Sequence, residues 1–160
     1  TKIDKSLIQK PNNSNAGRRR YTRVFTADQP IKFYVYAPEV FKKLRESFCG
    51  GDHVFVESFP HPLPPNAFAD QFSEGKSGSF FQKSLDEKFI IKSVSQYEAS
   101  VLIKLLPRYF DYMTTNPTTF IARIYGLYSI KLFDGFKMTY LVMSNIFPAK
   151  KVMQIHSRFD

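Results

Sequence analysis

The sequence is poor in the residues that support disulfide frameworks, metal sites and membrane spans. It has one cysteine, Cys49, so no disulfide can form within the chain. Its three histidines lie far apart and lack the spacing of a zinc site. No apolar run approaches the roughly 20 residues that a membrane-spanning helix needs. These absences favour a protein of the cytosol or the nucleus, and they predict no metal site within this chain.

Acidic residues are also scarce, because 14 Asp and Glu stand against 23 Lys and Arg, which gives a formal net charge of +9. Such an excess favours an acidic partner, such as anionic lipid, nucleic acid or a phosphorylated substrate. The chain has 17 Phe and 9 Tyr, which fall in strand and helix patterns that need a core. A nucleic-acid binder therefore fits less well than a folded domain with a phosphate-bearing partner.

The pattern of turns and apolar residues predicts a flexible basic arm over residues 1–30 and one domain over residues 31–160. Because the chain begins at Thr1 rather than Met and stops at Asp160 without a turn, we interpret it as part of a longer protein. Within the domain we predict strands near 31–36, 80–84, 89–94, 122–133 and 136–143, helices over 38–48 and from 96 onward, and a loop over 58–70.

No crossover helix separates the strands of either late pair, and Asp134-Gly135 is a hairpin signal between the last two. The fold class is therefore predicted as α+β, an antiparallel β-sheet with packed helices. Pro107 lies inside the pattern of the second helix, which we expect it to kink or end.

The stretch EGKSGSFF at residues 74–81 contains the Gly-Lys-Ser that ends one kind of phosphate-binding loop. That loop requires glycine at residue 70, where Asp70 stands, and a helix afterwards, where the pattern predicts a strand. The G-x-G-x-x-G loop also fails, because Ser77 and Phe80 occupy two of its glycine positions. What remains is a small hairpin tip, residues 75–79, whose backbone N–H groups can approach phosphate oxygens or simply form a turn.

Lys92 lies in the strand that follows, and alternation places it on one face with Ile90 and Val94. A lysine between inward aliphatic side chains is costly unless its charge meets an anion. The side chain either pairs with a phosphate group or extends from the strand to solvent, and the residues alone leave both interpretations open.

Residues 75–160 resemble the amino-terminal lobe of the phosphatidylinositol phosphate kinases, and residues 36–45 resemble the helix before that lobe. The matching motifs occur in the family's order and nearly at its spacing: YAPEVF (36–41) with LR (44–45), GKSGSFF (75–81), FIIK (89–92), LLPRY (105–109), NPTT (116–119), YGLY (125–128), VMSN (142–145) and RFD (158–160). The GKSGSFF loop and the ending IHSRFD are most similar to the 4-phosphate 5-kinases. A 3-phosphate 5-kinase, a 5-phosphate 4-kinase and a non-catalytic membrane scaffold remain alternatives.

The resemblance implies a kinase-like amino-terminal lobe that binds ATP. Lys92 would pair with the α- and β-phosphates, Ile90 would cover the adenine, and the hairpin tip with Phe80 would cover the phosphates. The segment after the last strand would be the hinge, which offers backbone groups to the base. The implied ATP-binding residues are Gly75, Lys76, Ser77, Gly78, Ser79, Phe80, Ile90, Lys92, Met143, Ser144, Asn145 and Phe147.

Glu98 is the only acidic residue between Lys92 and Asp111. The resemblance suggests it as the helix glutamate that holds the kinase lysine, which would make Lys92 and Glu98 the catalytic pair. Glu98 also completes a capping box with Ser95, and that role occupies its carboxylate locally. Both roles stay open at this point.

The resemblance further implies transfer of the γ-phosphoryl group of ATP to phosphatidylinositol 4-phosphate in an anionic membrane, giving phosphatidylinositol 4,5-bisphosphate. The Mg²⁺ ligands and the catalytic base are expected beyond residue 160, so this chain alone is expected to be inactive. We expect a cytoplasmic protein at the inner face of the plasma membrane, with a nuclear pool and a homodimer left open. Five basic residues would form either a lipid-facing patch or an ordinary charged surface: Lys104, Arg108, Arg123, Lys150 and Lys151. Arg18–Arg20 would either act likewise or serve as a nuclear localisation signal.

Overall fold

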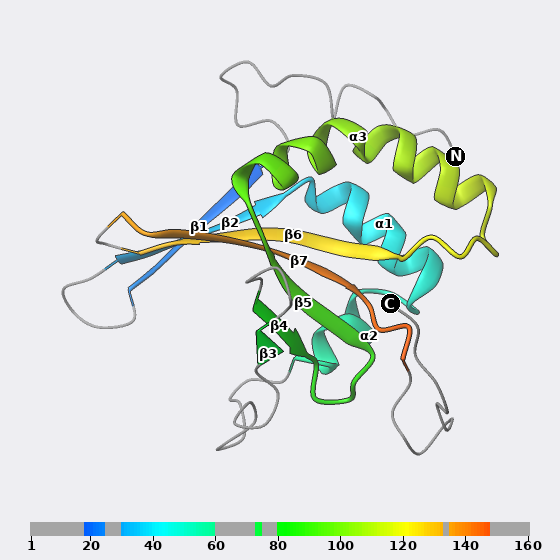
Figure 1. The fold of residues 1–160 in the computed structure, drawn as a ribbon, viewed down its shortest axis with the longest axis horizontal. Helices are drawn as coiled ribbons and strands as arrows, with labels where there is room; N and C mark the ends of the chain where they lie inside the picture. Colours follow the sequence, from blue (N-terminus) through cyan, green and yellow to red (C-terminus); the bar gives the residue numbers. More distant parts are fainter. Residues whose placement is uncertain (1–17, 25–29, 60–72, 75–79, 133–134, 148–160) are drawn as a thin grey trace.

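Residues 18–24, 30–59, 73–74, 80–132 and 135–147 are described by the structure, a computed structural model of the chain. Their elements, in chain order, are β1 (Arg18–Val24), β2 (Pro30–Tyr36), α1 (Pro38–Phe48), α2 (Asp52–Glu57), β3 (Ser73–Glu74), β4 (Phe80–Lys83), β5 (Phe89–Val94), α3 (Gln96–Thr115), β6 (Ile124–Lys131) and β7 (Lys137–Ser144). The seven strands form one antiparallel sheet in the spatial order β1–β2–β6–β7–β5–β4–β3 (Figure 1). The predicted α+β class with an antiparallel sheet is therefore confirmed.

Strand β1 lies in the segment that we expected to be a flexible arm. It pairs antiparallel with β2 from Arg18 opposite Tyr36 to Val24 opposite Pro30, so the expectation is wrong for residues 18–24. Without β1, the N–H and C=O groups along one side of β2 would form an exposed sheet edge. This long-range pairing, rather than any apolar alternation in β1, explains the strand. Residues 1–17 and 25–29 lie outside the described residues.

Two short elements on either side of the predicted loop at 58–70 were not revealed by the sequence pattern. Helix α2 begins after Gly51, whose φ of 105° ends the preceding turn, and the two-residue strand β3 pairs with β4. Helix α1, the β4–β5 pair and the β6–β7 hairpin lie where they were predicted. The proline-rich part of the predicted loop, residues 60–70, lies outside the described residues.

Helix α3 does not end at Pro107, contrary to one of our two expectations for that residue. It runs for 20 residues with Pro107 inside it. A proline removes one backbone hydrogen bond and crowds the preceding turn. The helix nevertheless continues because residues on both sides of the proline, Leu106, Phe110 and Met113, are buried in the core. Tertiary packing outweighs the local penalty here.

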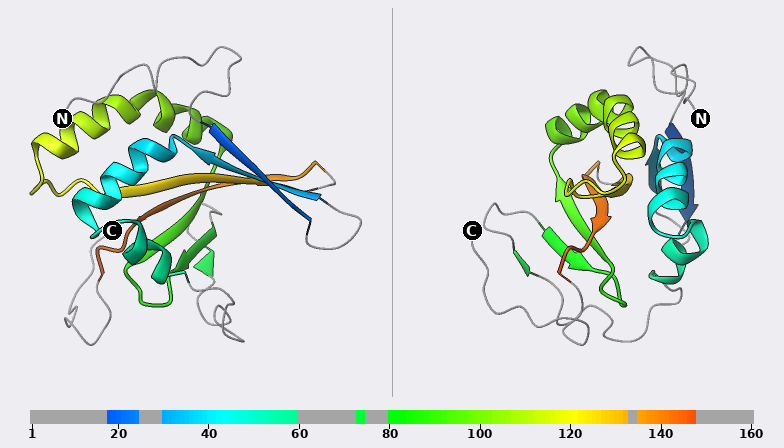
Figure 2. Two further views of the ribbon diagram at one scale, coloured as in Figure 1. Left: turned by 180° about the vertical axis from the view of Figure 1, so that it is seen from behind. Right: turned by 90° about the vertical axis from the view of Figure 1, so that its right-hand side faces the viewer.

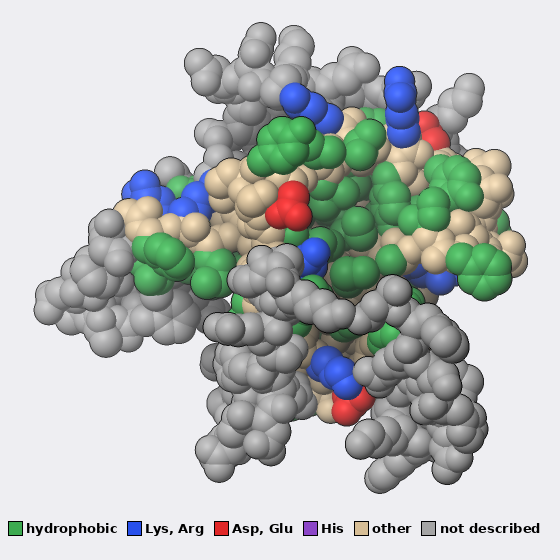
Figure 3. All heavy atoms as spheres, viewed as in Figure 1, with side chains coloured by type: hydrophobic (Ala, Val, Ile, Leu, Met, Phe, Trp, Pro, Cys, Tyr) green, Lys and Arg blue, Asp and Glu red, His purple; other side chains and the backbone are tan. Residues whose placement is uncertain are grey.

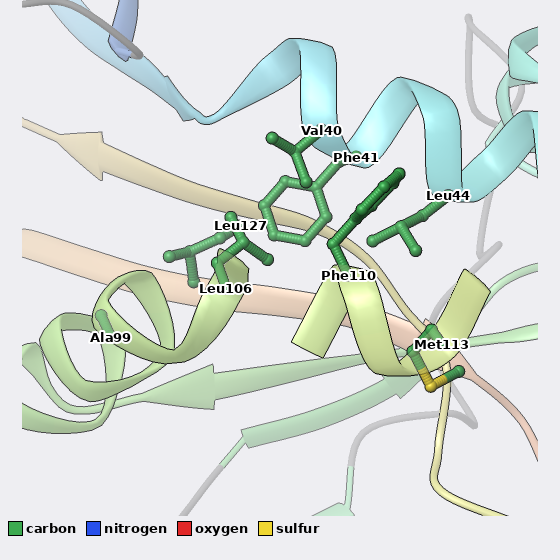
Figure 4. Close-up of a cluster of buried hydrophobic side chains, with 8 residues drawn as sticks. All are labelled: Val40, Phe41, Leu44, Ala99, Leu106, Phe110, Met113 and Leu127. Atoms are coloured by element: carbon green, nitrogen blue, oxygen red, sulfur yellow. The ribbon is translucent and has the colours of Figure 1, made fainter. Parts of the chain in front are cut away.

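Helices α1 and α3 cover one face of the central strands, which we call the helix-side face (Figure 2). The cluster beneath them is formed by Val40, Phe41, Leu44, Ala99, Leu106, Phe110, Met113 and Leu127 (Figure 4). Leu141 of β7 and Val94 of β5 pack against the same cluster from the sheet. Because side chains alternate along each strand, these two residues show which positions of β5 and β7 share this face.

A second cluster, Phe89, Tyr125 and Val142, packs with Phe55 and Phe59 on the opposite side of the sheet. The guanidinium of Arg45, next to this cluster, connects α1 to α2 and to β6. Its Nη1 donates to the carbonyl oxygen of Tyr125 at 2.6 Å and its Nε donates to Asp52 at 2.5 Å. It also lies 5.0 Å from the centre of the Phe55 ring. Arg45 therefore fixes α1 and α2 to the start of β6.

Gly126 occupies a position in β6 that no larger residue can fill without movement of its neighbours. The register of β6 against β7 shifts between Ile124 and Gly126. A Cβ atom at Gly126 would collide with the ring of Tyr128, which stacks on Phe33 at 5.7 Å between ring centroids. Packing against Tyr128 therefore explains why the YGLY motif has glycine at this position.

Candidate functional site

The EGKSGSFF stretch joins two strands of a hairpin, as the sequence analysis predicted. Ser73 pairs with Phe81 and Glu74 pairs with Phe80, and the chain continues from Phe80 into strand β4 rather than into a helix. The strand after the loop confirms that this is not the strand–loop–helix kind of phosphate loop. Residues 75–79, which carry the glycines and Lys76, lie outside the described residues.

Lys92 lies on the helix-side face of β5, on which Ile90 and Val94 also lie. Its cross-strand partners are Phe81 in β4 and Leu141 in β7. The side chain is half-buried, and its Nζ lies 5.5 Å from the centre of the Phe81 ring. A cation over an aromatic ring gains a modest attraction but no neutralising charge. Lys92 therefore presents a positive charge beside Phe81 of β4 and opposite Leu141, which packs against the apolar cluster under α3.

Glu98 caps α3 and does not pair with Lys92. Its Oε2 accepts from the Ser95 backbone N at 2.7 Å and from the Ser95 Oγ at 2.8 Å, while Ser95 Oγ accepts from the Glu98 N at 3.1 Å. These bonds, with a minor contribution from the charge of Lys92, lower the pKa of Glu98. Among the described residues no ion pair joins Lys92 to a carboxylate. The capping role is confirmed, and the catalytic role of Glu98 stays a prediction.

Two residues expected near the adenine lie opposite each other on the helix-side face. Ile90 of β5 pairs with Met143 of β7, and Met143 pairs on its other side with Ile124 of β6. All three side chains are only partly buried. Val142, the neighbour of Met143, is 4% exposed and belongs to the cluster on the other face. The apolar surface available to a base is therefore formed by Ile90 and Met143, and Val142 supports it from behind.

The end of β7, expected to be the hinge, is held by hydrogen bonds within the lobe. The N–H of Ser144 donates to the Arg123 carbonyl at 2.8 Å and the N–H of Asn145 donates to the Lys88 carbonyl at 2.8 Å. The N–H of Phe147 donates to Asn145 Oδ1 at 3.0 Å. Three of the backbone donors in this segment are thus already used. Adenine recognition here remains a prediction, with fewer backbone donors than the sequence analysis assumed.

A cluster of polar side chains around Asp86 at the β4–β5 turn, which we call the Asp86 cluster, was not identified from the sequence. Asp86 accepts from Ser84 Oγ at 2.7 Å, from Ser58 Oγ at 2.8 Å and from Lys88 Nζ at 3.0 Å. Partial burial raises the pKa of Asp86, but the hydrogen bonds from Ser84, Ser58 and Lys88 outweigh this effect and hold the pKa at about 2. An aspartate at a turn is a common signal, yet nothing in the sequence pointed to Ser58 as its partner.

The turn that contains the Asp86 cluster is hydrogen-bonded to the expected hinge through its backbone. Asn145 Nδ2 donates to the carbonyl of Glu87 at 2.7 Å, next to the bond between Asn145 N and the Lys88 carbonyl. The turn that Asp86 organises therefore holds the end of β7 at two points. Asp86 acts on the expected nucleotide site only through position, since it lies on the turn rather than on the helix-side face.

The residues of the expected lipid-facing patch have different surroundings. Lys104 and Arg108 are exposed on α3. Arg123 is engaged instead, because its Nη2 donates to the Pro117 carbonyl at 2.8 Å and its guanidinium lies 5.2 Å from the centre of the Phe48 ring. Arg123 thus supports the connection between α3 and β6. Lys150 and Lys151 lie outside the described residues.

Within the part of the chain that the structure describes, His, Cys, Asp and Glu side chains do not gather in groups of three or more that could hold a metal ion. None of the described helices combines the length and the apolar character required to span a membrane.

Comparisons with known proteins place these features in one family. The family model described as phosphatidylinositol-4-phosphate 5-kinase matches residues 65–160, which is more than half of the chain. A probable phosphatidylinositol phosphate kinase of Dictyostelium discoideum is 38% identical over 132 residues, covering 81% of this chain and 18% of that protein. A phosphatidylinositol 4-phosphate 5-kinase of Schizosaccharomyces pombe is 38% identical over 136 residues, covering 84% and 18%.

The type-1 alpha phosphatidylinositol 4-phosphate 5-kinase of Homo sapiens is 34% identical over 130 residues, covering 81% of this chain and 22% of that protein. The chain therefore spans about a fifth of the length of the curated relatives it matches. The matched residues include β4, β5, α3, β6 and β7, the elements that carry Lys92, Ile90 and Met143.

Proposed function

Because the chain belongs to the phosphatidylinositol-4-phosphate 5-kinase family, we propose that the protein transfers the γ-phosphoryl group of ATP to the inositol ring of phosphatidylinositol 4-phosphate, giving phosphatidylinositol 4,5-bisphosphate. The relatives from Schizosaccharomyces pombe and Homo sapiens are named as phosphatidylinositol 4-phosphate 5-kinases, which supports this substrate. The activity belongs to the whole protein, and this chain provides its ATP-binding lobe.

The observation that carries the proposal is the position of Lys92 on β5. Its positive charge lies between Phe81 and Leu141 on the helix-side face, with no described carboxylate near enough to form an ion pair. A phosphate group is the partner that such a charge fits, because an ammonium is a compact point charge with three donors. The hairpin of β3 and β4 lies beside it and supplies the segment expected to cover that phosphate.

The apolar pair Ile90 and Met143 supports an adenine site next to Lys92 on the same face. Adenine sites combine apolar surfaces with a small number of polar contacts, and we propose that backbone groups at the end of β7 supply these contacts. Mg²⁺ would neutralise charge on the phosphates during transfer. The described residues contain no cluster of carboxylates for it, and its ligands are expected beyond residue 160.

The substrate also leads us to propose a place in the cell for the protein. A kinase that phosphorylates a lipid headgroup must meet the membrane from its aqueous side. The excess of positive charge favours an anionic leaflet, which is the property of the inner face of the plasma membrane. We therefore propose a cytoplasmic protein that binds this membrane peripherally.

The proposal is tested by transfer of radiolabelled phosphate from ATP to lipid vesicles by the full-length protein. Phosphatidylinositol 4-phosphate should be phosphorylated, and Lys92→Met should lower the rate at least 100-fold, because phosphoryl transfer depends on electrostatic positioning. Lys42→Met is the matched control, since Lys42 is an exposed lysine of α1 that pairs only with Glu46 in the described structure.

Each other outcome has a definite meaning. Preference for the 3-phosphate or the 5-phosphate isomer would replace the proposed substrate while retaining the kinase chemistry. Absence of transfer to any isomer, with intact vesicle binding, would support the membrane scaffold instead. Equal rates for Lys92→Met and Lys42→Met would contradict the role of Lys92 and with it the reasoning from structure.

A further inference from the structure

The basic segment Arg18–Arg20 has no part in the proposed lipid-kinase chemistry, and a threonine follows it closely. Arg19 and Arg20 stand three and two positions before Thr22. Thr22 is the only serine or threonine in the sequence with arginine at both of these positions. Protein kinases select substrates by such charge patterns, because carboxylates in a peptide groove bind guanidinium groups through paired hydrogen bonds. The sequence around Thr22 therefore has the pattern of a substrate for an arginine-directed kinase.

Strand β1, which carries Thr22, lies at one edge of the sheet. It is first in the spatial order of the strands, and β2 is the strand that pairs with it among the described residues. Edge strands pair along one side of their backbone and open locally more readily than central strands. A kinase binds the peptide around its acceptor in an extended conformation, which β1 already has. The edge position of β1 therefore suits recognition by a modifying enzyme.

The register places Thr22 at the end of a row of lysines that crosses four strands. Thr22 lies directly opposite Lys32 of β2, Lys32 lies opposite Lys131 of β6, and Lys131 lies opposite Lys137 of β7. Residues directly opposite each other share one face of an antiparallel sheet. Lys131 follows Leu127 of the core cluster by four residues, so alternation places all four positions on the helix-side face. We call the three lysines the lysine row.

The lysine row has positive charge that nothing in the described structure neutralises. Like charges directly opposite each other destabilise a pair of strands, and neighbouring strands are only about 4.8 Å apart. Among the described residues no carboxylate forms an ion pair with the row, and Lys137 Nζ donates to the neutral Gln96 Oε1 at 2.9 Å. Lys32 and Lys131 are exposed, and Figure 3 shows Lys and Arg side chains together over the projecting strands.

A phosphate group on Thr22 would fit this surrounding charge. Phosphothreonine carries a charge of about −1.5 to −2 and three strong acceptor oxygens. Lys32 stands directly opposite, with about 5 Å between Cα atoms, and Arg20 shares the same face about 7 Å along β1. One cation on each of two paired strands would therefore flank the phosphate. Attraction to Lys32 acts across the pair and would strengthen the pairing of β1 with β2.

We propose that Thr22 is a phosphorylation site for an arginine-directed serine/threonine kinase, and that the phosphate stabilises the pairing of β1 with β2. In this step the bond between the γ-phosphorus of ATP and the ADP oxygen breaks, and a bond from that phosphorus to Thr22 Oγ1 forms. The hydroxyl proton passes to the catalytic carboxylate of the modifying kinase, and ADP leaves. The inference is independent of the lipid-kinase activity, since it concerns the edge of the sheet rather than Lys92.

The site is tested by incubating the full-length protein with ATP and the catalytic subunit of cyclic-AMP-dependent protein kinase, an arginine-directed probe. Mass spectrometry should locate phosphate on Thr22, above the background of a reaction without the added kinase. The variant Arg19→Gln/Arg20→Gln should lower the rate at Thr22 about 100-fold, since each charge-assisted contact contributes roughly tenfold. Lys104→Gln/Arg108→Gln removes two exposed charges from α3 and should leave this rate unchanged.

The effect on strand pairing is tested by hydrogen exchange on the same samples. Phosphorylation should slow exchange of the β1 and β2 amides about fivefold, the size expected for an exposed ion pair, and high salt should reduce the effect. Lys32→Gln should remove most of the effect, whereas Lys131→Gln should retain it, because Lys131 lies one strand further from Thr22. Thr22→Val, treated with the kinase, gives the exchange rates without phosphate at this position.

Several results would overturn the proposal. Phosphate on other residues with Thr22 unmodified would remove the site, and equal rates for the arginine variant and the α3 variant would show that Arg19 and Arg20 are not recognised. Faster exchange after modification of Thr22 would mean that the phosphate displaces β1. Equal losses in Lys32→Gln and Lys131→Gln would mean that general charge, rather than the pair across the two strands, produces the effect.

Discussion

Replacement of Asp86 by asparagine tests whether the β4–β5 turn determines the stability of the lobe and the position of the expected hinge. Asn has nearly the same shape as Asp, so the change removes the negative charge with little loss of volume. The hydroxyls of Ser84 and Ser58, which are 0% and 2% exposed as residues, lose a charged acceptor. The side chain of Lys88 loses its ion pair at the same time.

The magnitude follows from the pKa of Asp86, which is about 2 against an ordinary value of 3.8. A shift of nearly two units corresponds to about 2 kcal/mol of folding free energy, and the value is an upper estimate because the side chain is 32% exposed. Hydrogen bonds to a charged group are worth a similar amount, about 1.5–3 kcal/mol. We therefore expect Asp86→Asn to lower the free energy of unfolding by about 1–2 kcal/mol at pH 7.

The pH dependence has a definite sign. A carboxyl group whose pKa is lower in the folded protein contributes stability above its unfolded pKa and loses it as the pH falls through the folded pKa. The difference between the unaltered chain and Asp86→Asn should therefore be constant from pH 7 to about pH 5. It should shrink by about 1 kcal/mol or somewhat less by pH 3 and continue to shrink toward pH 2.

Urea unfolding at several pH values measures this difference. Asp111→Asn is the control, because Asp111 is an exposed carboxylate of α3 and no side-chain contact is described for it. A difference for Asp86→Asn that stays constant down to pH 3, or that matches the control at every pH, would refute the reasoning. Raised hydrogen exchange at the Asn145 amide in Asp86→Asn would show that the turn holds the end of β7.

Two further predictions concern α3. Leu106→Ala should lower the free energy of unfolding by about 3 kcal/mol, because Leu106 is 0% exposed. The adjacent Leu105→Ala should lower it by less than about 1 kcal/mol, because Leu105 is 49% exposed. Thermal unfolding compares the two variants, and similar losses of stability would mean that Pro107 disturbs the helix register. Glu98→Ala should lower stability by about 1 kcal/mol through loss of the capping box, while Glu98→Gln should retain most of it. If Glu98→Gln keeps stability but loses kinase activity in the full-length protein, Glu98 has the catalytic role; unchanged activity would rule that role out.

Local chemistry in the sequence was sufficient for several elements. The apolar spacing of α1, the capping box of Ser95 and Glu98, and the Asp134-Gly135 hairpin signal each predicted an element that the structure contains. Alternation alone placed Lys92 on one face with Ile90 and Val94, and the registers confirm this. These features depend on neighbours in the chain, so the sequence carries their signals directly.

The site depended more strongly on contacts between distant residues. The bonds from Ser58 to Asp86 and from Asn145 to the turn join residues 28 and 58 positions apart in the chain. No periodic pattern in the sequence predicts such partners, because side-chain hydrogen bonds depend on how the elements pack. The same reason explains why the occupied N–H groups of the expected hinge were not foreseen.

The sequence by itself determined the class of fold, the family and the strand that carries Lys92, since repeating patterns and short words record local geometry. Tertiary structure decided the rest. It made β1 a strand by pairing it with β2, and it kept α3 continuous through Pro107 by burying Leu106, Phe110 and Met113. It also brought Lys32, Lys131 and Lys137 into one row, because the register between strands, which no single strand encodes, sets which side chains become neighbours.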